Sequence, residues 1–185
     1  PHYYHDTYGA SSAEENGERA ALEIEKAILF EGPESVSAVI GEPVSQPLGG
    51  VVPPSNYWPM VREICDKYEV LLVSDEVITG FGRTGTMFGL EHWGVKPDLI
   101  QFAKAITSGY FPLGGIGVSD EIIKTMDDSG KPFMHAYTYS AHPVGCAIAN
   151  AMLSVIETED FPGQAADKGK RLLNGLKDAL GNHPN

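Results

Sequence analysis

The feature that most constrains the fold is a short apolar run, Val-Leu-Leu-Val at residues 70–73, followed at once by Ser74, Asp75 and Glu76. Four consecutive apolar residues without a polar side are typical of strands in a parallel sheet, which are buried on both faces. Parallel strands need a long crossover connection, and the connection is usually a helix. The run therefore predicts an α/β domain.

The rest of the chain fits this alternation of strands and helices. Short apolar runs predict strands at 37–41, 99–103 and 114–118, and helical spacing predicts helices near 13–30, after 55, after 119, after 143 and at 163–181. Ser12 and Glu15 are spaced as a capping box at the first helix. The predicted fold class is α/β, with a mostly parallel sheet flanked by helices.

Composition excludes several classes of partner. Lys and Arg number 13 against 25 Asp and Glu, a net charge of −12, and a surface this acidic repels nucleic-acid phosphates. No apolar run approaches the roughly 20 residues that span a bilayer. Cys65 and Cys146 stand alone in predicted helices, which indicates reduced core thiols in a cytoplasmic protein.

Three predicted strands end in polar residues that suit chemistry. The first is followed by Glu42, the second by Asp75 and Glu76, and the third by Lys104. Ligands of open α/β sheets bind outside the carboxyl ends of the strands. The sequence therefore predicts a site where acidic groups and one lysine meet.

Lys104 has apolar neighbours on both sides and no acidic residue within five positions. Burial would lower the pKa of such an amine, and the neutral amine is a nucleophile that can form a Schiff base. The alternative is a lysine whose stem packs on apolar surface while its ammonium reaches water.

Asp75 is open to several interpretations. It could bind a metal, orient a base or accept a hydrogen bond from a protonated ring nitrogen, and it could equally be a helix cap or part of an ion pair. A nucleotide-binding Walker pair is excluded because no phosphate-binding loop lies upstream. Residues 80–85 match Gly-x-Gly-x-x-Gly, but no helical pattern follows, as a dinucleotide site requires.

The segment 135–140 offers a histidine and several hydroxyl groups before a predicted helix. Such groups suit a phosphate at a helix N-terminus, although Ser140 could simply cap the helix. His135 and His142 could bind a metal, but their spacing matches no zinc site.

Three segments in order resemble the class III aminotransferases, which are pyridoxal 5′-phosphate (PLP) enzymes of fold type I. They are residues 74–85, residues 97–115 around Lys104, and residues 135–143, where Ala141 replaces the usual glycine. The resemblance covers nearly the whole chain. It implies that residues 1–160 are part of the large PLP-binding domain and that residues 161–185 begin the C-terminal small domain.

The resemblance implies a role for five residues. Lys104 would hold PLP as a Schiff base and then move the substrate proton, and Asp75 would keep the pyridine nitrogen protonated. Val77 would pack on the ring, and Glu42 would help to order the site. Thr138 would bind the phosphate in the neighbouring subunit, which implies a homodimer.

The resemblance also implies the reaction, transfer of an amino group from an ω-amino acid or amine to a 2-oxo acid. Residues 42–50 lack the second glutamate of relatives that use 2-oxoglutarate, which favours pyruvate. An aminomutase or racemase of the same family stays open, because the cofactor carries the hard chemistry. The chain resembles the central part of an enzyme more than twice as long, so a catalytically incompetent fragment is a further alternative.

Overall fold

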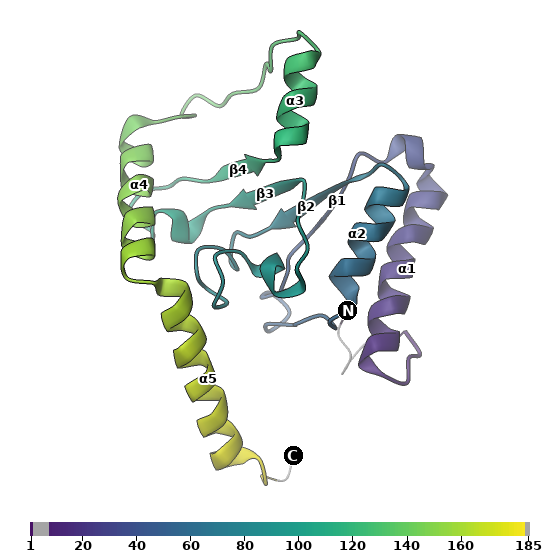
Figure 1. Cartoon of the computed structure of the whole chain (residues 1–185), viewed down its shortest axis with the longest axis vertical. Coiled ribbons are helices and arrows are strands. Elements are labelled where there is room, and N and C mark those ends of the chain that lie inside the picture. Colours follow the sequence, from purple (N-terminus) through teal and green to yellow (C-terminus); the bar gives the residue numbers. More distant parts are fainter. Residues whose placement is uncertain (2–7, 184–185) are drawn as a thin grey trace.

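The fold is seen in a computed structural model that describes residue 1 and residues 8–183. Four strands form one sheet in the order β1-β2-β3-β4: β1 Ala38–Gly41, β2 Leu71–Asp75, β3 Leu99–Phe102 and β4 Gly115–Val118. β2 pairs in parallel with β1 and β3, and β4 pairs with β3 antiparallel. The predicted mostly parallel sheet is confirmed, with the strand expected at 114–118 as its antiparallel edge (Figure 1).

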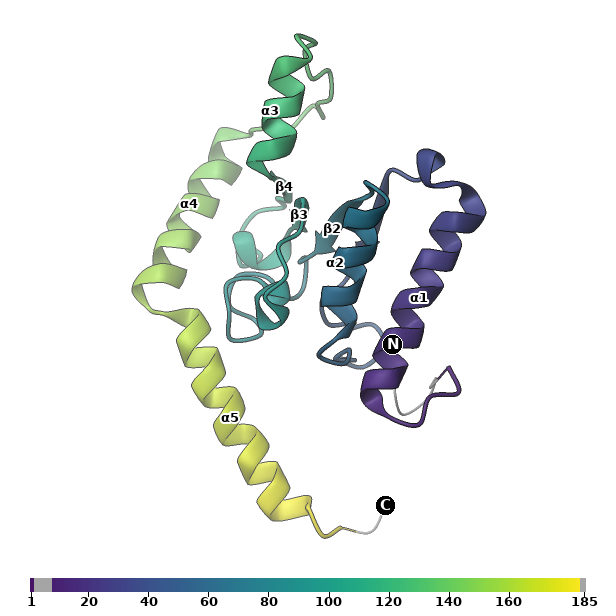
Figure 2. The ribbon, with the colours of Figure 1, turned by 45° about the vertical axis from the view of Figure 1, so that its right-hand side comes forward.

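The helices lie where the apolar spacing predicted them. They are α1 Ala13–Glu31, α2 Tyr57–Lys67, α3 Asp120–Asp128, α4 Pro143–Thr158 and α5 Phe161–Leu180, with 3-10 turns η1 Pro33–Ser35, η2 Gly89–Trp93 and η3 Lys104–Ile106. Figure 2 shows α1 and α2 beside the sheet on one side of the molecule and α4 on the other, where α4 packs on η3 and α5 continues away from the sheet.

Side chains cap the starts of three of these helices, α1, α3 and α5. Ser12 Oγ accepts a hydrogen bond from Glu15 N at 3.1 Å, as predicted. The Glu15 carboxylate accepts from Ser11 N at 2.7 Å, so the reciprocal half of the predicted capping box lies one residue earlier. α5 begins two residues before its predicted start because Asp160 Oδ1 accepts from Gly163 N at 3.1 Å.

The main core lies on one face of the sheet. Leu72 of β2 packs there in a cluster with buried residues of α2 and α1: Trp58, Val61, Ile64, Cys65, Ala21 and Ile28. Burying these apolar side chains stabilises the fold by about 25 cal/mol per Å² of apolar area. The α1–α2 pair therefore forms a helical layer against this face.

The opposite face of the sheet is open in this chain. Leu71 is 36% exposed, and Ile40 and Ile116, which the strand register places on the same face, are 57% and 63% exposed. The expectation that β2 is buried on both faces is therefore wrong for this chain. The apolar pattern of β2 matches a sheet with two covered faces, and only one is covered by the described residues.

Both cysteines are free thiols in different environments. Cys65 is buried in the core, as predicted, whereas Cys146 is exposed on α4, so the expectation of a core thiol is wrong there. α4 turns residues such as Gly145 and Ala149 inward and Cys146 outward. None of the helices in the described part of the chain combines the length and the apolar character needed to cross a bilayer.

The buried thiol predicts a pH dependence of stability. Burial raises the pKa of Cys65 from 9.0 to about 11. The unfolded chain then loses the thiol proton first, so the free energy of unfolding should fall between pH 9 and pH 11, by at most about 1.4 kcal/mol per pH unit. Urea denaturation of the protein from its complete reading frame should show this slope, and Cys65→Ala should reduce it. Cys146→Ala should leave it unchanged; equal slopes in all three proteins would contradict the prediction.

Candidate functional site

The strand register brings three predicted site residues to one edge of the sheet. β1 ends opposite Ser74, so Glu42 lies level with Asp75. Asp75 in turn pairs with Gln101 of β3, three residues before Lys104. Glu42, Asp75 and Lys104 thus follow or end three neighbouring parallel strands, at the edge where open α/β sheets bind ligands.

Lys104 combines an exposed side chain with a constrained backbone. It opens η3 with φ 47°, in the left-handed region, which costs a non-glycine residue about 1–2 kcal/mol. Thr107, 1% exposed, anchors the turn by donating from Oγ1 to Phe111 O at 2.6 Å. Strained backbone of this kind clusters at functional sites.

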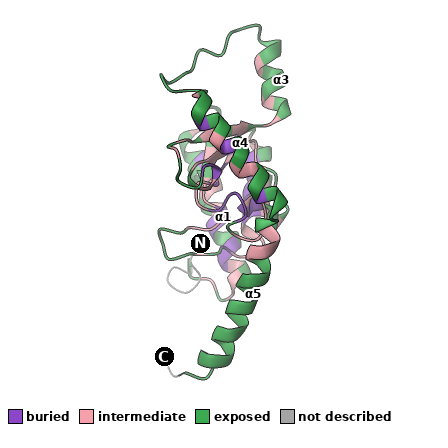
Figure 3. Cartoon of the chain, turned by 90° about the vertical axis from the view of Figure 1, so that its left-hand side faces the viewer, coloured by how far each residue is buried: buried purple, intermediate pink, exposed green. Residues whose placement is uncertain are grey.

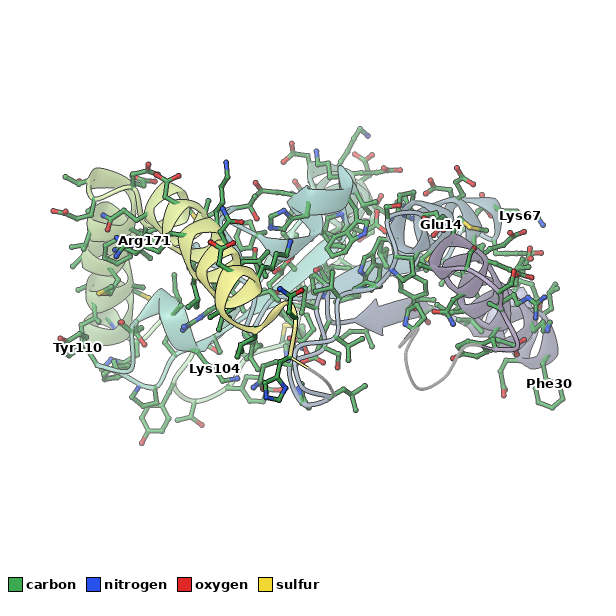
Figure 4. The ribbon with its side chains drawn as sticks, turned by 90° about the horizontal axis from the view of Figure 1, so that it is seen from below. Glu14, Phe30, Lys67, Lys104, Tyr110 and Arg171 are labelled. Carbon is green, nitrogen blue, oxygen red and sulfur yellow. The ribbon has the colours of Figure 1, made fainter. Side chains whose placement is uncertain are left out.

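Of the two interpretations of Lys104, the structure supports the one in which its amine reaches water, and not the buried amine. Its side chain is exposed, on the side of the molecule away from Phe30 (Figure 4). The apolar neighbours in sequence contribute to packing without covering the amine: Ile106 packs with Phe81, Ala149 and Ile156 instead.

Asp75 and Val77 are held together at the end of β2. Both are half-buried, and Asp75 Oδ1 accepts a hydrogen bond from Val77 N at 3.1 Å. Among residues 8–183 no salt bridge involves Asp75, so the ion-pair interpretation is not supported there. One carboxylate oxygen is thus tied to the backbone of the turn that carries Val77.

Glu42 sits in a small closed loop. Its Oε2 accepts from Ser45 Oγ at 2.8 Å, and Ser45 forms a bridge with Val51 through two backbone hydrogen bonds of 3.0 Å. Trp58 Nε1 donates to Pro43 O at 3.2 Å and so ties the loop to α2. Glu42 is therefore half-buried and oriented before any ligand binds.

Glu76 is the residue of the site region for which the sequence predicted no role of its own. It is 1% exposed, and its carboxylate accepts from Ser74 Oγ at 3.0 Å, Gly89 N at 2.7 Å, Leu90 N at 3.1 Å and Thr79 Oγ1. We call this arrangement the Glu76 clamp. The acidic pair after β2 thus divides: Asp75 faces the open side and Glu76 the interior. Strand alternation could have indicated this division.

The glycine-rich segment 80–85 turns back on itself without opening an α-helix. Gly82 and Gly85 have φ of 92° and 96°, and Phe81 N donates to Met87 O. This geometry supports the exclusion of a dinucleotide site. Gly85 instead approaches α5 closely: a Cβ atom there would lie 3.1 Å from Ala166 Cβ.

Thr138 is not brought to the strand ends. It is exposed in the segment 131–142, which Figure 1 shows running from α3 to α4 beyond the edge strand β4. Ser140 Oγ accepts from Tyr137 N at 2.9 Å, and His142 is the N-cap residue of α4, so the alternative in which Ser140 caps the helix is wrong.

Comparison with known proteins decides the family. The sequence model described as aminotransferase class-III matches residues 2–185.

The chain belongs to the class III aminotransferases.

Relatives of this class III chain are longer than it is. The putrescine–pyruvate aminotransferase of Pseudomonas aeruginosa is 42% identical over 98% of this chain and 40% of its own length. The diaminobutyrate–2-oxoglutarate transaminase of Halomonas elongata is 43% identical over 100% of this chain and 40% of its own. The chain therefore spans about 40% of the length of the curated relatives it matches.

Solved structures of the same class share the fold. The amine transaminase of an uncultivated Pseudomonas species, in its PLP-bound form, is 40% identical and superposes with a TM-score of 0.90 over 97% of this chain and 41% of its own. The predicted family and fold type I architecture are confirmed.

The Glu76 clamp leaves no room for a side chain at Gly89. A Cβ atom there would lie 2.9 Å from both Pro43 Cβ and Thr79 Cβ. We expect Gly89→Ala to lower the free energy of unfolding by about 1–3 kcal/mol, because overpacking forces the neighbours apart. The matched control is Gly169→Ala on α5, where a Cβ would meet nothing within 4 Å and should stabilise by up to about 1 kcal/mol. Denaturant titration measures both, and equal effects would contradict the prediction.

Proposed function

We propose that this chain forms the cofactor-binding core of a PLP-dependent transaminase that moves an amino group from an ω-amino acid or amine to a 2-oxo acid. The observation that carries the proposal is the placement of Lys104 and Asp75 at the ends of adjacent parallel strands. An amine and a carboxylate at one sheet edge are the pair that this chemistry needs. The PLP-bound relative, with a TM-score of 0.90, supports the proposal.

The residues present fit PLP by their chemistry. The exposed primary amine of Lys104 can bond to the cofactor's aldehyde carbon. Asp75 is half-buried and only its Oδ1 is used by Val77 N, so Oδ2 is suited to a protonated pyridine nitrogen. The half-buried side chain of Val77 offers an apolar surface for a ring face.

When bound, PLP supplies an electron sink for the carbanion formed at the carbon that bears the amino group. In our proposal Lys104 first holds the cofactor through Nζ. Once released from the cofactor, Nζ would take the proton from the carbon that bears the amino group, as a general base. Asp75 keeps a proton on the ring nitrogen, and Glu42 orders the site beside it.

The acceptor that we propose is pyruvate. The loop after Glu42, residues 43–50, contains no further glutamate. The Pseudomonas aeruginosa relative is named for pyruvate, whereas the Halomonas relative, at nearly the same identity, is named for 2-oxoglutarate. Formation of alanine from pyruvate would identify amino transfer and exclude an aminomutase or racemase as the main activity.

The second candidate is that the isolated 185 residues are a fragment without catalytic activity. The open sheet face favours it, and so does α5, which is exposed along most of its length (Figure 3). Its residues Leu172, Leu173 and Leu176 are 65%, 52% and 47% exposed. We propose that residues 1–160 belong to the large domain and that residues 161–185 begin the small one. We also propose a cytoplasmic location, since Cys65 and Cys146 are both free thiols.

The proposed nucleophile, Lys104, can be tested against a control lysine at the other end of the same strand. Lys104 follows β3 and Lys96 precedes it. In the protein from its complete reading frame, Lys104→Ala should lose the borohydride-trapped PLP adduct and at least 10³-fold in transaminase rate, because both the covalent link and the general base are removed. Lys96→Ala should keep both. A trapped adduct on another residue, found by peptide mapping, would overturn the assignment.

The homodimer proposal rests on the segment that carries Thr138. Phe133, Tyr137 and Tyr139 are 70%, 75% and 79% exposed around it, an apolar surface suited to burial by a second copy. Thr138 would then serve the partner's cofactor phosphate.

Mixed dimers test this directly. If Thr138 acts in the partner's site, a dimer of one Lys104→Ala and one Thr138→Ala subunit has one site with both residues intact. We expect about half of the wild-type activity per dimer, far above either parent variant. If Thr138 serves its own subunit, neither site is intact and no activity should be regained.

A further inference from the structure

We propose that Glu76 is a positioning residue: its buried carboxylate sets the spacing between the strand ends that carry Glu42 and Asp75, and cofactor affinity depends on that spacing. The inference rests on the proposed function, since it concerns the same cofactor. Glu76 itself faces the interior, away from the proposed cofactor contacts, and would act only through its neighbours.

The clamp uses both carboxylate oxygens fully. Oε1 accepts from Ser74 Oγ and Leu90 N, and Oε2 accepts from Thr79 Oγ1 and Gly89 N. Each oxygen thus receives one hydroxyl and one backbone N–H. A buried carboxylate with four donors is held in one place, because losing any donor leaves a charge less well compensated.

The clamp joins the ends of β1 and β2. Gly89 is wedged so closely that an added Cβ would lie 2.9 Å from Pro43 Cβ, and Pro43 directly follows Glu42. On the other strand, Asp75 lies between the clamp residues Ser74 and Glu76. Displacement of Gly89 or of the Glu76 carboxylate must therefore shift one acidic site residue relative to the other.

The variant Glu76→Gln removes one of the two oxygens that accept hydrogen bonds. One oxygen becomes an NH₂ group, which cannot accept from a backbone N–H. Rotated side-chain hydroxyls can adapt by accepting, but either Gly89 N or Leu90 N must lose its acceptor. The turn 89–90 should then move away, although the side-chain volume is unchanged.

The control is Glu25→Gln. Glu25 Oε1 accepts from Lys67 Nζ at 2.7 Å and Tyr68 OH at 2.8 Å between α1 and α2, in the helical layer away from the strand ends. Loss of the Glu25 carboxylate should change the stability of the protein but leave the positions of Glu42 and Asp75 unchanged. A second pair acts on the clamp itself: Thr79→Val removes one hydroxyl donor, and Thr79→Ser restores it.

The experiment titrates PLP into apoprotein from the complete reading frame and records the dissociation constant, the pH dependence of the bound-cofactor absorbance and the urea midpoint. We expect Glu76→Gln to weaken PLP binding at least tenfold and to shift the pH dependence, because Asp75 moves. Thr79→Val should weaken it severalfold. Glu25→Gln and Thr79→Ser should match the wild type in affinity and pH dependence, whatever their stability.

The outcomes separate the two proposals. A wild-type protein that forms no borohydride-trapped adduct on Lys104 overturns the proposed function, and the inference with it. A wild-type adduct with equal affinity and pH dependence in Glu76→Gln and Glu25→Gln overturns the inference alone. If Glu76→Gln does not fold, the Thr79 pair decides: equal affinity of Thr79→Val and Thr79→Ser overturns the positioning role.

Discussion

A buried carboxylate is the constraint on which the site region depends. Burying the Glu76 carboxyl group at 1% exposure would cost several kcal/mol if its oxygens had no hydrogen-bond partners. Its four donors come from β2, from the turn after β2 and from the start of η2, so these segments have to meet at one point. The glycines of the loop between them supply the positive φ and the close approaches that the arrangement requires.

Parallel pairing then converts this local order into a site. The strands β1, β2 and β3 run in the same direction and in a defined register. Glu42, Asp75 and Lys104 therefore lie at the same edge of the sheet, although they are far apart in sequence. The strained backbone at Lys104 is held by Thr107, a buried neighbour, while its amine stays free to react. The backbone can be fixed while the amine stays accessible, because Thr107 holds the turn and the side chain of Lys104 takes no part in holding it.

The open surfaces of the chain agree with its share of the family's length. One sheet face and most of α5 expose apolar side chains, and the curated relatives it matches are more than twice as long. The apolar pattern of β2 predicted two covered faces. The apolar pattern of a strand shows the environment for which the strand is suited, whereas its exposure depends on which other segments are present. This difference explains why Leu71 is more exposed than its pattern predicted.

The sequence by itself determined the α/β alternation, the positions of the helices and the strand ends at which Glu42, Asp75 and Lys104 lie, because hydrophobic periodicity and parallel topology are local or nearly local signals. Three motifs in order were enough to indicate the family. Only the tertiary structure showed which groups donate to the Glu76 carboxylate, namely Ser74, Thr79, Gly89 and Leu90. It alone also showed that Cys146 is exposed and that Thr138 lies in the exposed segment between α3 and α4. Those facts depend on contacts between segments that are distant in sequence, or on which helix face meets the core, and spacing along the chain carries no record of either.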